Sequence, residues 1–272
     1  MKQQQSKRKT YPSDITRAEF EKIRLDLEGH KKRTKPREHD LYEVFCGLLY
    51  LLKSGCQWAM IPSDFPPYSV VYYYFSQWKK QQGRKPSLLD RCLKKSVGAA
   101  RKDLGRKARP SLCIVDAQSV KNTDSAEQKG YDAGKKVSGI KRHIVVDTQG
   151  LPHALCVTTA NVTDRAGALT ALSRAKKELK GVEKVLVDGG YTGEKFTQAV
   201  EELIQAEVEV AKRSELHTFS VMPKRWIVER SFAWLEKCRR LWKNCERKLS
   251  TSLQFVVLAF LVILLKRSPN RL

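Results

Sequence analysis

Two short apolar runs in this chain each lead directly into an aspartate. Residues 111–115 precede Asp116, and residues 182–187 precede Asp188. Short apolar runs rich in β-branched residues predict buried strands, with each aspartate at the strand's end. If the two strands are parallel neighbours, both carboxylates lie at one edge of the sheet, where open α/β sheets bind ligands. Whether these two acids meet therefore decides most of what this chain can do.

Asp116 has a structural explanation as well as a functional one. Arg109 and Lys121 flank the first run, so an ion pair is one way to neutralise its charge. Two adjacent carboxylates repel each other and stay ionised together only when a cation lies between them. Hard oxygen ligands with open positions suit Mg²⁺ or Mn²⁺. From these residues alone, an ion pair and a metal site both remain open.

The overall charge favours a polyanionic partner. The 272 residues include 52 Lys and Arg against 29 Asp and Glu, a formal net charge of +23. Such an excess favours nucleic acid. A membrane is disfavoured because the apolar run 255–265 is shorter than the roughly 20 residues of a spanning helix, so we expect a buried helix. Seven scattered cysteines without a CxxC motif indicate reduced thiols in a cytosolic protein.

The spacing of apolar residues divides the chain into three parts. Residues 1–37 are predicted to form a basic N-terminal arm and a helix, and residues 38–104 a helical DNA-binding domain. Residues 105–272 are predicted to form a second, mixed α/β part with C-terminal helices. Helices are expected at residues 15–27, 40–52, 69–82 and 88–103. A helix, a short piece and a second helix joined by turns resemble a helix-turn-helix unit.

The helix expected at residues 69–82 is dense in aromatic residues and is followed by Lys79 and Lys80. Some of these aromatic side chains belong in a core, as in any three-helix module. Aromatic residues next to lysines also suit a surface that meets DNA. We predict DNA contacts from Tyr73, Lys79 and Lys80.

The C-terminal part alternates strands and helices. Beyond the first strand, strands are expected at residues 142–147, 151–159, 182–187 and 207–211, and helices at 164–179 and 194–205. This order predicts a mixed α/β sheet with helices on its faces. Residues 121–141 are polar and contain glycine, which predicts a long functional loop. The basic residues predicted to contact DNA here are Lys135, Lys136, Lys141 and Arg142.

A helix expected over residues 223–245 offers a third acid. Glu229 lies off its apolar stripe, among bases. One interpretation is an intrahelical ion pair, for example with Arg225. The other is that Glu229 completes a metal site while neighbouring bases hold phosphates, with Glu236 as the rival acid. The bases predicted to contact DNA are Arg225, Arg230, Lys237 and Arg240.

Taken together, these segments resemble bacterial insertion-sequence transposases of the DDE type, in the insertion-sequence-five group. The matching segments are residues 115–121, 130–136, 141–147, 159–164, 187–191 and 225–234, with an N-terminal helical segment at 55–78. The resemblance implies an RNase H-like catalytic fold with Asp116, Asp188 and Glu229 as the acidic triad. The signature of the broader superfamily has a tyrosine three residues before the arginine, where this chain has Met222. The downstream basic residue of that signature lies one position before Lys237, where this chain has Glu236.

The resemblance also implies a function. A DNA transposase would bind the element's ends, cleave the backbone and join the 3′-hydroxyl to target DNA, using two Mg²⁺ ions for which Mn²⁺ can substitute. Its partners would be double-stranded DNA and a second copy of the chain, in the bacterial cytoplasm at the nucleoid. The alternatives are a DNA-binding protein derived from a transposase, a metal-dependent nuclease without strand transfer, and a structural basic protein.

Overall fold

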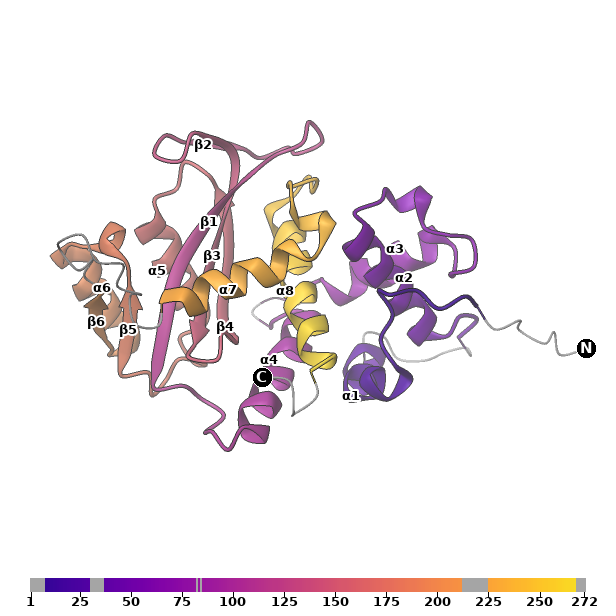
Figure 1. The fold of residues 1–272 in the computed structure, drawn as a ribbon, viewed down its shortest axis with the longest axis horizontal. Coiled ribbons are helices and arrows are strands. Elements are labelled where there is room, and N and C mark those ends of the chain that lie inside the picture. Colours follow the sequence, from indigo (N-terminus) through magenta and orange to yellow (C-terminus); the bar gives the residue numbers. More distant parts are fainter. Residues whose placement is uncertain (1–7, 30–36, 82, 84, 212–224, 268–272) are drawn as a thin grey trace, which may run out of the picture.

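The computed structural model describes residues 8–29, 37–81, 83, 85–211 and 225–267. An N-terminal helical part is joined to a mixed α/β part (Figure 1). The expected arrangement, a small all-α part followed by a mixed sheet flanked by helices, is confirmed. The helical part consists of α1 (Arg17–Glu28), α2 (Leu41–Ser54), the short η1 (Trp58–Met60), α3 (Tyr68–Trp78) and α4 (Leu88–Asp103).

Local sequence signals begin and end these helices. Thr16 and Glu19 form a capping box at the start of α1, so each side chain accepts from a backbone amide that has no partner within the helix. The side chain of Asp40 caps α2. α2 ends at Gly55, whose φ of 72° lies in the left-handed region that favours glycine.

Within the described residues, six strands form one mixed sheet in the order β2-β3-β1-β5-β6, and β4 also pairs with β3. β1 is antiparallel to β3 and parallel to β5, which is parallel to β6. The carboxyl ends of β1, β5 and β6 therefore point to the same edge. The strands are β1 (Leu112–Lys121), β2 (Gly130–Asp132), β3 (Val137–Asp147), β4 (Pro152–Thr159), β5 (Lys184–Val187) and β6 (Glu207–Val210).

Separate apolar cores cover the two faces of the sheet. Successive residues of β1 alternate between these faces, so Val115 packs against α5 and α6 while Ile114 packs against α7 and α8. Asp116 therefore projects on the same face as Ile114. The covering helices are α5 (Asp164–Arg174), α6 (Glu194–Ile204), α7 (Arg225–Glu236) and α8 (Leu249–Leu265).

The apolar helix α8 connects the helical part to the sheet. Residues 255–261 are all buried, in a core that extends from α1–α4 to the α7 face of the sheet. The ring centroid of Phe255 lies 4.7 Å from that of Phe75 on α3. The prediction of a buried helix is confirmed. Among the described residues, no helix is both long and apolar enough to cross a membrane.

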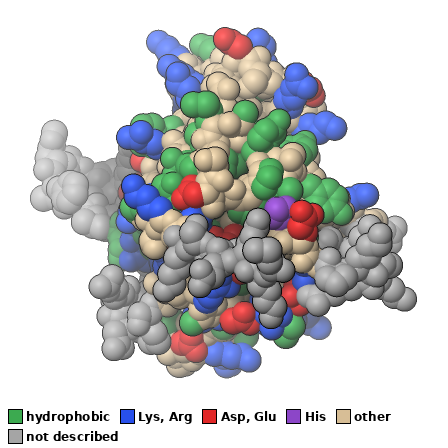
Figure 2. Space-filling model, turned by 90° about the vertical axis from the view of Figure 1, so that its right-hand side faces the viewer, with side chains coloured by type: hydrophobic (Ala, Val, Ile, Leu, Met, Phe, Trp, Pro, Cys, Tyr) green, Lys and Arg blue, Asp and Glu red, His purple; other side chains and the backbone are tan. Residues whose placement is uncertain are grey.

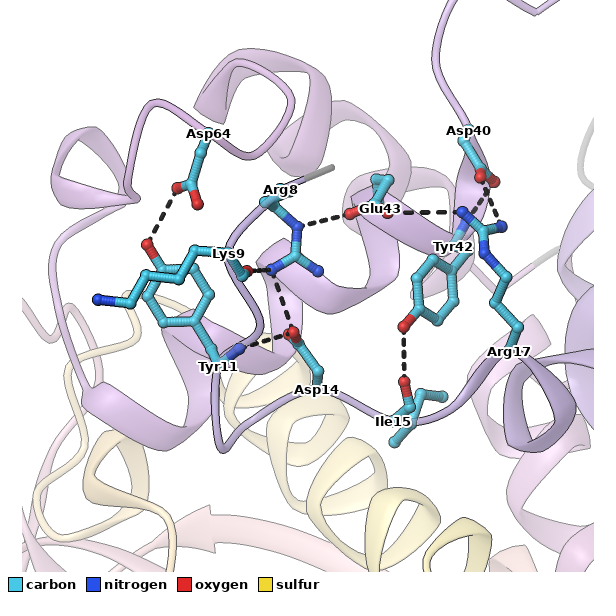
Figure 3. Close-up of polar contacts among 10 residues, drawn as sticks. All are labelled: Arg8, Lys9, Tyr11, Asp14, Ile15, Arg17, Asp40, Tyr42, Glu43 and Asp64. Atoms are coloured by element: carbon cyan, nitrogen blue, oxygen red, sulfur yellow. Dashed lines mark hydrogen bonds and ion pairs between the residues drawn. The ribbon is translucent and has the colours of Figure 1, made fainter. Parts of the chain in front are cut away.

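The segment before α1 is fastened to α2 by charged and aromatic contacts (Figure 3). Arg8 Nε lies 2.6 Å from Glu43 Oε2, and Arg8 Nη1 lies 3.1 Å from Asp14 Oδ2. The same guanidinium covers the ring of Phe65, with Cζ 4.2 Å from the ring centroid. Residues 8–29 of the predicted basic arm and helix therefore pack on the helical part, and residues 1–7 and 30–36 lie outside the described residues.

Three local expectations differ from the structure. Residues 121–141, expected as a loop, include β2 and the start of β3, because Gly130 and Gly139 face each other in a hairpin that composition does not reveal. The helix expected to reach residue 245 ends at Glu236, and η3 (Arg239–Leu241) follows. Asp116 lies within β1 rather than at its end, because β1 continues alongside β3 to Lys121.

Candidate active site

Asp116 and Asp188 come from neighbouring parallel strands and lie at the same level. β1 and β5 pair with Ile114 opposite Leu186. Two residues further along each strand, the same register places Asp116 opposite Asp188. Both aspartates line one small pocket at this edge of the sheet. The structure therefore brings the two acids together, as the parallel-strand argument predicts.

Glu229 lies on α7, next to this pocket. The preceding residue, Val228, lines the pocket together with the two aspartates, and Glu229 itself is exposed. Figure 1 shows α7 lying across the sheet, and it contacts β1 and β3. In the part of the chain that the structure describes, no three His, Cys, Asp or Glu side chains cluster closely enough to hold a metal ion. The structure thus unites the aspartates but does not gather all three carboxylates into one ligand set.

The aspartate pair has the chemistry of a divalent-metal site. Asp188 Oδ1 accepts from the amide of Gly190 at 2.9 Å, and Asp116 Oδ1 accepts from the amide of Ala117 at 2.7 Å. These bonds orient both carboxylates, whose hard oxygens are the ligands that Mg²⁺ and Mn²⁺ prefer. A Cβ built on Gly189 would meet nothing within 4 Å, so the backbone next to Asp188 is open to a close approach. The residues present therefore fit a divalent cation.

Gln118 links the strand of Asp116 to the end of α7. Its Nε2 donates to Glu236 Oε1 at 3.2 Å. Glu236, the alternative third acid, is thus hydrogen-bonded to Gln118. Opposite Gln118 on β3, Arg142 is 2% exposed and donates to the carbonyl of Leu241 at 2.7 Å. Burial lowers the pKa of Arg142 to about 10. Its guanidinium is enclosed by protein, and the DNA contact expected of Arg142 stays a prediction.

Lys141 is also enclosed rather than presented to a ligand. Its Nζ lies 2.8 Å from Asp164 Oδ1 and 3.1 Å from Asp132 Oδ2, and its side chain is 6% exposed. The ammonium group of Lys141 is thus paired with two carboxylates, and the DNA contact expected of it stays a prediction. Lys135, on the β2–β3 hairpin, remains 44% exposed and donates to the carbonyl of Ala117 at 3.0 Å, next to Asp116. Lys136, in the same turn, is exposed.

Arg230 lies between two indole rings on α7. Its Cζ is 4.7 Å from the ring centroid of Trp226 and 5.0 Å from that of Trp234. Its Nη2 donates to the carbonyl of Gln149 at 3.1 Å, so Arg230 ties α7 to the β3–β4 turn. Burial lowers its pKa. Arg230 is partly exposed and directly follows Glu229 in the sequence.

The other bases of the α7 region differ in exposure. Arg240, in η3, is buried, with Nε 2.8 Å from Glu246 Oε1 and Nη1 donating to the carbonyl of Cys56 at 2.9 Å. It therefore holds η3 to the helical part, and the DNA contact expected of Arg240 stays a prediction. Lys237 is exposed. Arg225 begins α7, but its side chain lies outside what the structure describes.

α3 presents a polar aromatic face. Tyr73 is 44% exposed and Lys80 is exposed. Lys79 donates to Thr251 Oγ1 of α8 at 2.8 Å, and burial lowers its pKa. The DNA contact expected of Lys79 stays a prediction. Figure 2 shows this end of the molecule, where hydrophobic side chains occupy the middle of the face and lysines and arginines lie around them.

The mixed sheet and its flanking helices are consistent with an RNase H-like fold, as expected. The chain belongs to the family described as "Transposase DDE domain", whose model matches residues 107–265. A second family model, described as "Putative transposase of IS4/5 family", matches residues 15–83. The resemblance to DDE-type insertion-sequence transposases is therefore confirmed, and it covers the helical part as well as the sheet.

Two curated proteins are similar to this chain. One, named "Putative transposase for insertion sequence element IS402", from Burkholderia cepacia, is 36% identical over 118 residues, 40% of this chain and 55% of that protein. The other, named "Putative transposase for insertion sequence element IS6501", from Brucella ovis, is 30% identical over 131 residues, 46% of this chain and 98% of that protein. The match thus spans about half of the first relative and nearly all of the second.

Proposed function

We propose that this chain is a DNA transposase that binds the ends of an insertion sequence, cleaves the phosphodiester backbone and joins the 3′-hydroxyl to target DNA. The observation that carries the proposal is the alignment of Asp116 and Asp188 on neighbouring parallel strands, beside α7. Family membership and the names of the two relatives support it. The net charge of +23 supports a DNA substrate.

Asp116, Asp188 and Glu229 are the residues that would hold two Mg²⁺ ions, with Mn²⁺ as a substitute. Ions bound there supply charge neutralisation at phosphorus and lower the pKa of bound water. Because Glu229 is exposed and follows a pocket residue, rotation of its side chain is the movement that would bring its carboxylate towards the aspartate pair. Asp116 and Asp188 are held in place by the sheet before any ligand arrives.

The proposed DNA surface uses the predicted contact residues that the structure leaves exposed or partly exposed. These are Tyr73 on α3, Lys80 just beyond the end of α3, and Lys135 and Lys136 on the β2–β3 hairpin. Near Glu229 they are the partly exposed Arg230 and the exposed Lys237, with Arg225 retained from its position in the sequence. Joining both ends of an element requires two catalytic domains, so we propose a homodimer on DNA.

A strand-transfer assay with pre-cut ends carrying free 3′-hydroxyls tests this function. Wild-type protein with Mg²⁺ should join the ends to target DNA, and chelation should stop the reaction. Asp116→Asn and Asp188→Asn should each lose several kcal/mol of transition-state stabilisation, which lowers the rate by about a hundredfold or more. Asp103→Asn, at an exposed position of α4, is the matched control and should be unaffected.

Each other outcome of this assay points to a different class of protein. Hydrolysis without joining would identify a metal-dependent nuclease, and DNA binding alone, independent of metal, would identify a DNA-binding module. Full activity in Asp116→Asn would refute the site itself. Glu229→Gln is tested beside Glu236→Gln, because loss of activity in the second alone would move the third ligand from Glu229 to Glu236.

A further inference from the structure

Arg165, in the first turn of α5, contacts the loop that follows Asp188. Its Nε donates to the carbonyl of Gly190 at 3.1 Å, and the amide of Gly190 donates to Asp188 Oδ1 at 2.9 Å. Gly190 lies in η2 (Gly189–Tyr191), the short turn directly after Asp188. The guanidinium of Arg165 is thus separated from a carboxylate of the candidate site by a single residue.

The fold uses only a small part of this guanidinium. Within the described residues, Arg165 has no ion pair, and its one side-chain hydrogen bond uses Nε. The preceding residue, Asp164, is paired instead with Lys141 at 2.8 Å and with Lys135 at 3.6 Å. A guanidinium carries five N–H donors, and the bond to Gly190 occupies one of them. Because Arg165 is exposed, Nη1 and Nη2 are accessible to a ligand from outside.

The loop next to Arg165 carries little side-chain bulk. Nη1 lies 3.5 Å from the point where a Cβ on Gly193 would stand. A Cβ on Gly189, next to Asp188, would meet nothing within 4 Å. Because both positions are glycine, the loop leaves room for a phosphate backbone to approach the guanidinium and Asp188 together.

Asp116 has a basic neighbour in the same arrangement. Lys135 Nζ donates to the carbonyl of Ala117 at 3.0 Å, and the amide of Ala117 donates to Asp116 Oδ1. Because parallel pairing places Asp116 opposite Asp188, Lys135 and Arg165 approach the same edge of the sheet. Both come from the side that α5 covers, whereas the aspartates project towards α7. Cations therefore flank this edge on both sides, since basic residues also lie on the α7 side.

We infer that Arg165 binds a backbone phosphate of the DNA strand that crosses this edge of the sheet, next to the phosphate on which the aspartate pair acts. The inference rests on the proposed function, because it needs DNA at Asp116 and Asp188. A guanidinium binds phosphate through two parallel N–H···O bonds, and Nη1 and Nη2 of Arg165 present such a pair. The bond from Nε to Gly190 already orients the side chain, so less conformational freedom is lost when a phosphate binds.

The experiment measures how tightly the full-length chain binds a pre-cut element end in which one phosphate at a time is an uncharged methylphosphonate. Fluorescence anisotropy in the presence of EDTA follows binding without cleavage. One methylphosphonate close to the joined 3′-end should weaken binding to wild type by about 10-fold or more, as expected for the loss of a hydrogen bond between charged groups. The same replacement should leave binding to Arg165→Gln unchanged, because that variant has already lost the contact.

Salt dependence and two further variants separate this contact from a general loss of charge. With unmodified DNA, Arg165→Gln should reduce the slope of log affinity against log salt by about 0.9. Arg165→Lys keeps the charge and should retain the slope. Arg174→Gln, at an exposed position in the last turn of α5, removes the same charge from the other end of the helix and is the matched control. It should respond to every methylphosphonate as wild type does.

The outcomes separate this inference from the proposed function. If wild type binds and joins the ends, but Arg165→Gln responds to every methylphosphonate as wild type does, the phosphate contact is refuted and the proposed function stands. If wild type neither binds nor joins the ends, the proposed function fails and the inference fails with it. If Arg165→Gln unfolds at a lower temperature than Arg174→Gln and binds DNA more weakly with an unchanged salt slope, Arg165 only holds the loop after Asp188 and the inference is overturned.

Discussion

The guanidinium of Arg101 on α4 meets the carboxylate of Asp147 at the end of β3, and the two side chains are 6% and 0% exposed. Asp147 also accepts from the amides of Gln149 and Leu151, at 2.8 and 3.0 Å, and from His153 Nε2 at 3.1 Å. One buried carboxylate thus closes the β3–β4 turn and fastens the helical part to the sheet. Removing it would leave the turn amides and Nη1 of Arg101 without this acceptor, while Nε of Arg101 keeps its bond to the carbonyl of Lys107.

Asp147→Ala should lower the free energy of unfolding by about 3–5 kcal/mol, because it leaves the buried charge of Arg101 without its partner. Urea denaturation followed by circular dichroism measures this change. Asp103→Ala, at an exposed position two residues beyond Arg101, is the control and should stay within about 0.5 kcal/mol of wild type. Equal effects of the two substitutions would contradict a special role for the pair.

Stability should fall in acid. Burial raises the pKa of Asp147, but hydrogen bonds from His153 and two backbone amides outweigh this and lower it. Burial likewise raises the pKa of Asp132, and hydrogen bonds from Ser119, the Lys135 amide and Lys141 lower it to about 2. Both values lie below the roughly 3.9 of an unfolded aspartate, so the unfolded chain binds more protons as the pH falls.

The stabilisation from Asp132 is therefore complete above about pH 4 and is lost as the pH falls towards about 2. The lowered pKa of Asp147 gives a stabilisation that is likewise lost in acid. Urea midpoints measured at pH 5, 4 and 3 should decrease in that order. Asp132→Asn should flatten part of this dependence, since the amide does not titrate. A midpoint that stays constant from pH 5 to 3 would rule out the two aspartates as the source of acid sensitivity.

Two helical glycines should respond to alanine with opposite signs. A Cβ on Gly167 of α5 would clash with the ring of His143, which is fully buried and bonded to Thr158 Oγ1 at 2.9 Å. Gly167→Ala should therefore destabilise the fold by about 1–3 kcal/mol. A Cβ on Gly98 of α4 meets nothing within 4 Å, so Gly98→Ala should stabilise it by about 0.5–1 kcal/mol. Thermal unfolding of both variants checks the pair.

Exposed and buried bases should affect DNA binding differently. Lys136→Ala or Lys237→Ala should reduce the slope of log affinity against log salt by about 0.9 for each phosphate that the variant no longer neutralises. Arg142→Met should leave that slope unchanged, because the guanidinium is enclosed by protein. It should lower the free energy of unfolding, because the guanidinium donates a hydrogen bond to the carbonyl of Leu241. Fluorescence anisotropy over a series of salt concentrations measures the slopes. A reduced slope in Arg142→Met would mean that this residue reaches DNA after all.

Much of the fold follows from local patterns. The runs before Asp116 and Asp188 predict their strands, and apolar spacing predicts the main helices, because these features depend on neighbours along the chain. The β2–β3 hairpin does not follow from composition, because its residues are polar and its pairing, with Gly130 opposite Gly139, has no signal in the local sequence. The start of β3 is a strand because it pairs with the end of β1.

The candidate site was predictable in part for the same reason. The meeting of Asp116 and Asp188 follows from parallel pairing, whereas the burial of Lys141 depends on acids from β2 and the start of α5. A basic residue in a strand looks the same in sequence whether it faces phosphates or an internal carboxylate.

The position of α8 has a consequence for synthesis on the ribosome. Helices α1 to α4 emerge first, yet their apolar surfaces are covered by residues 249–265, which are translated later. Until that segment leaves the exit tunnel, the nascent N-terminal half exposes hydrophobic surface that invites association with other chains. When α8 arrives, it covers both the helical part and one face of the sheet, so we expect these two parts to reach their final packing together.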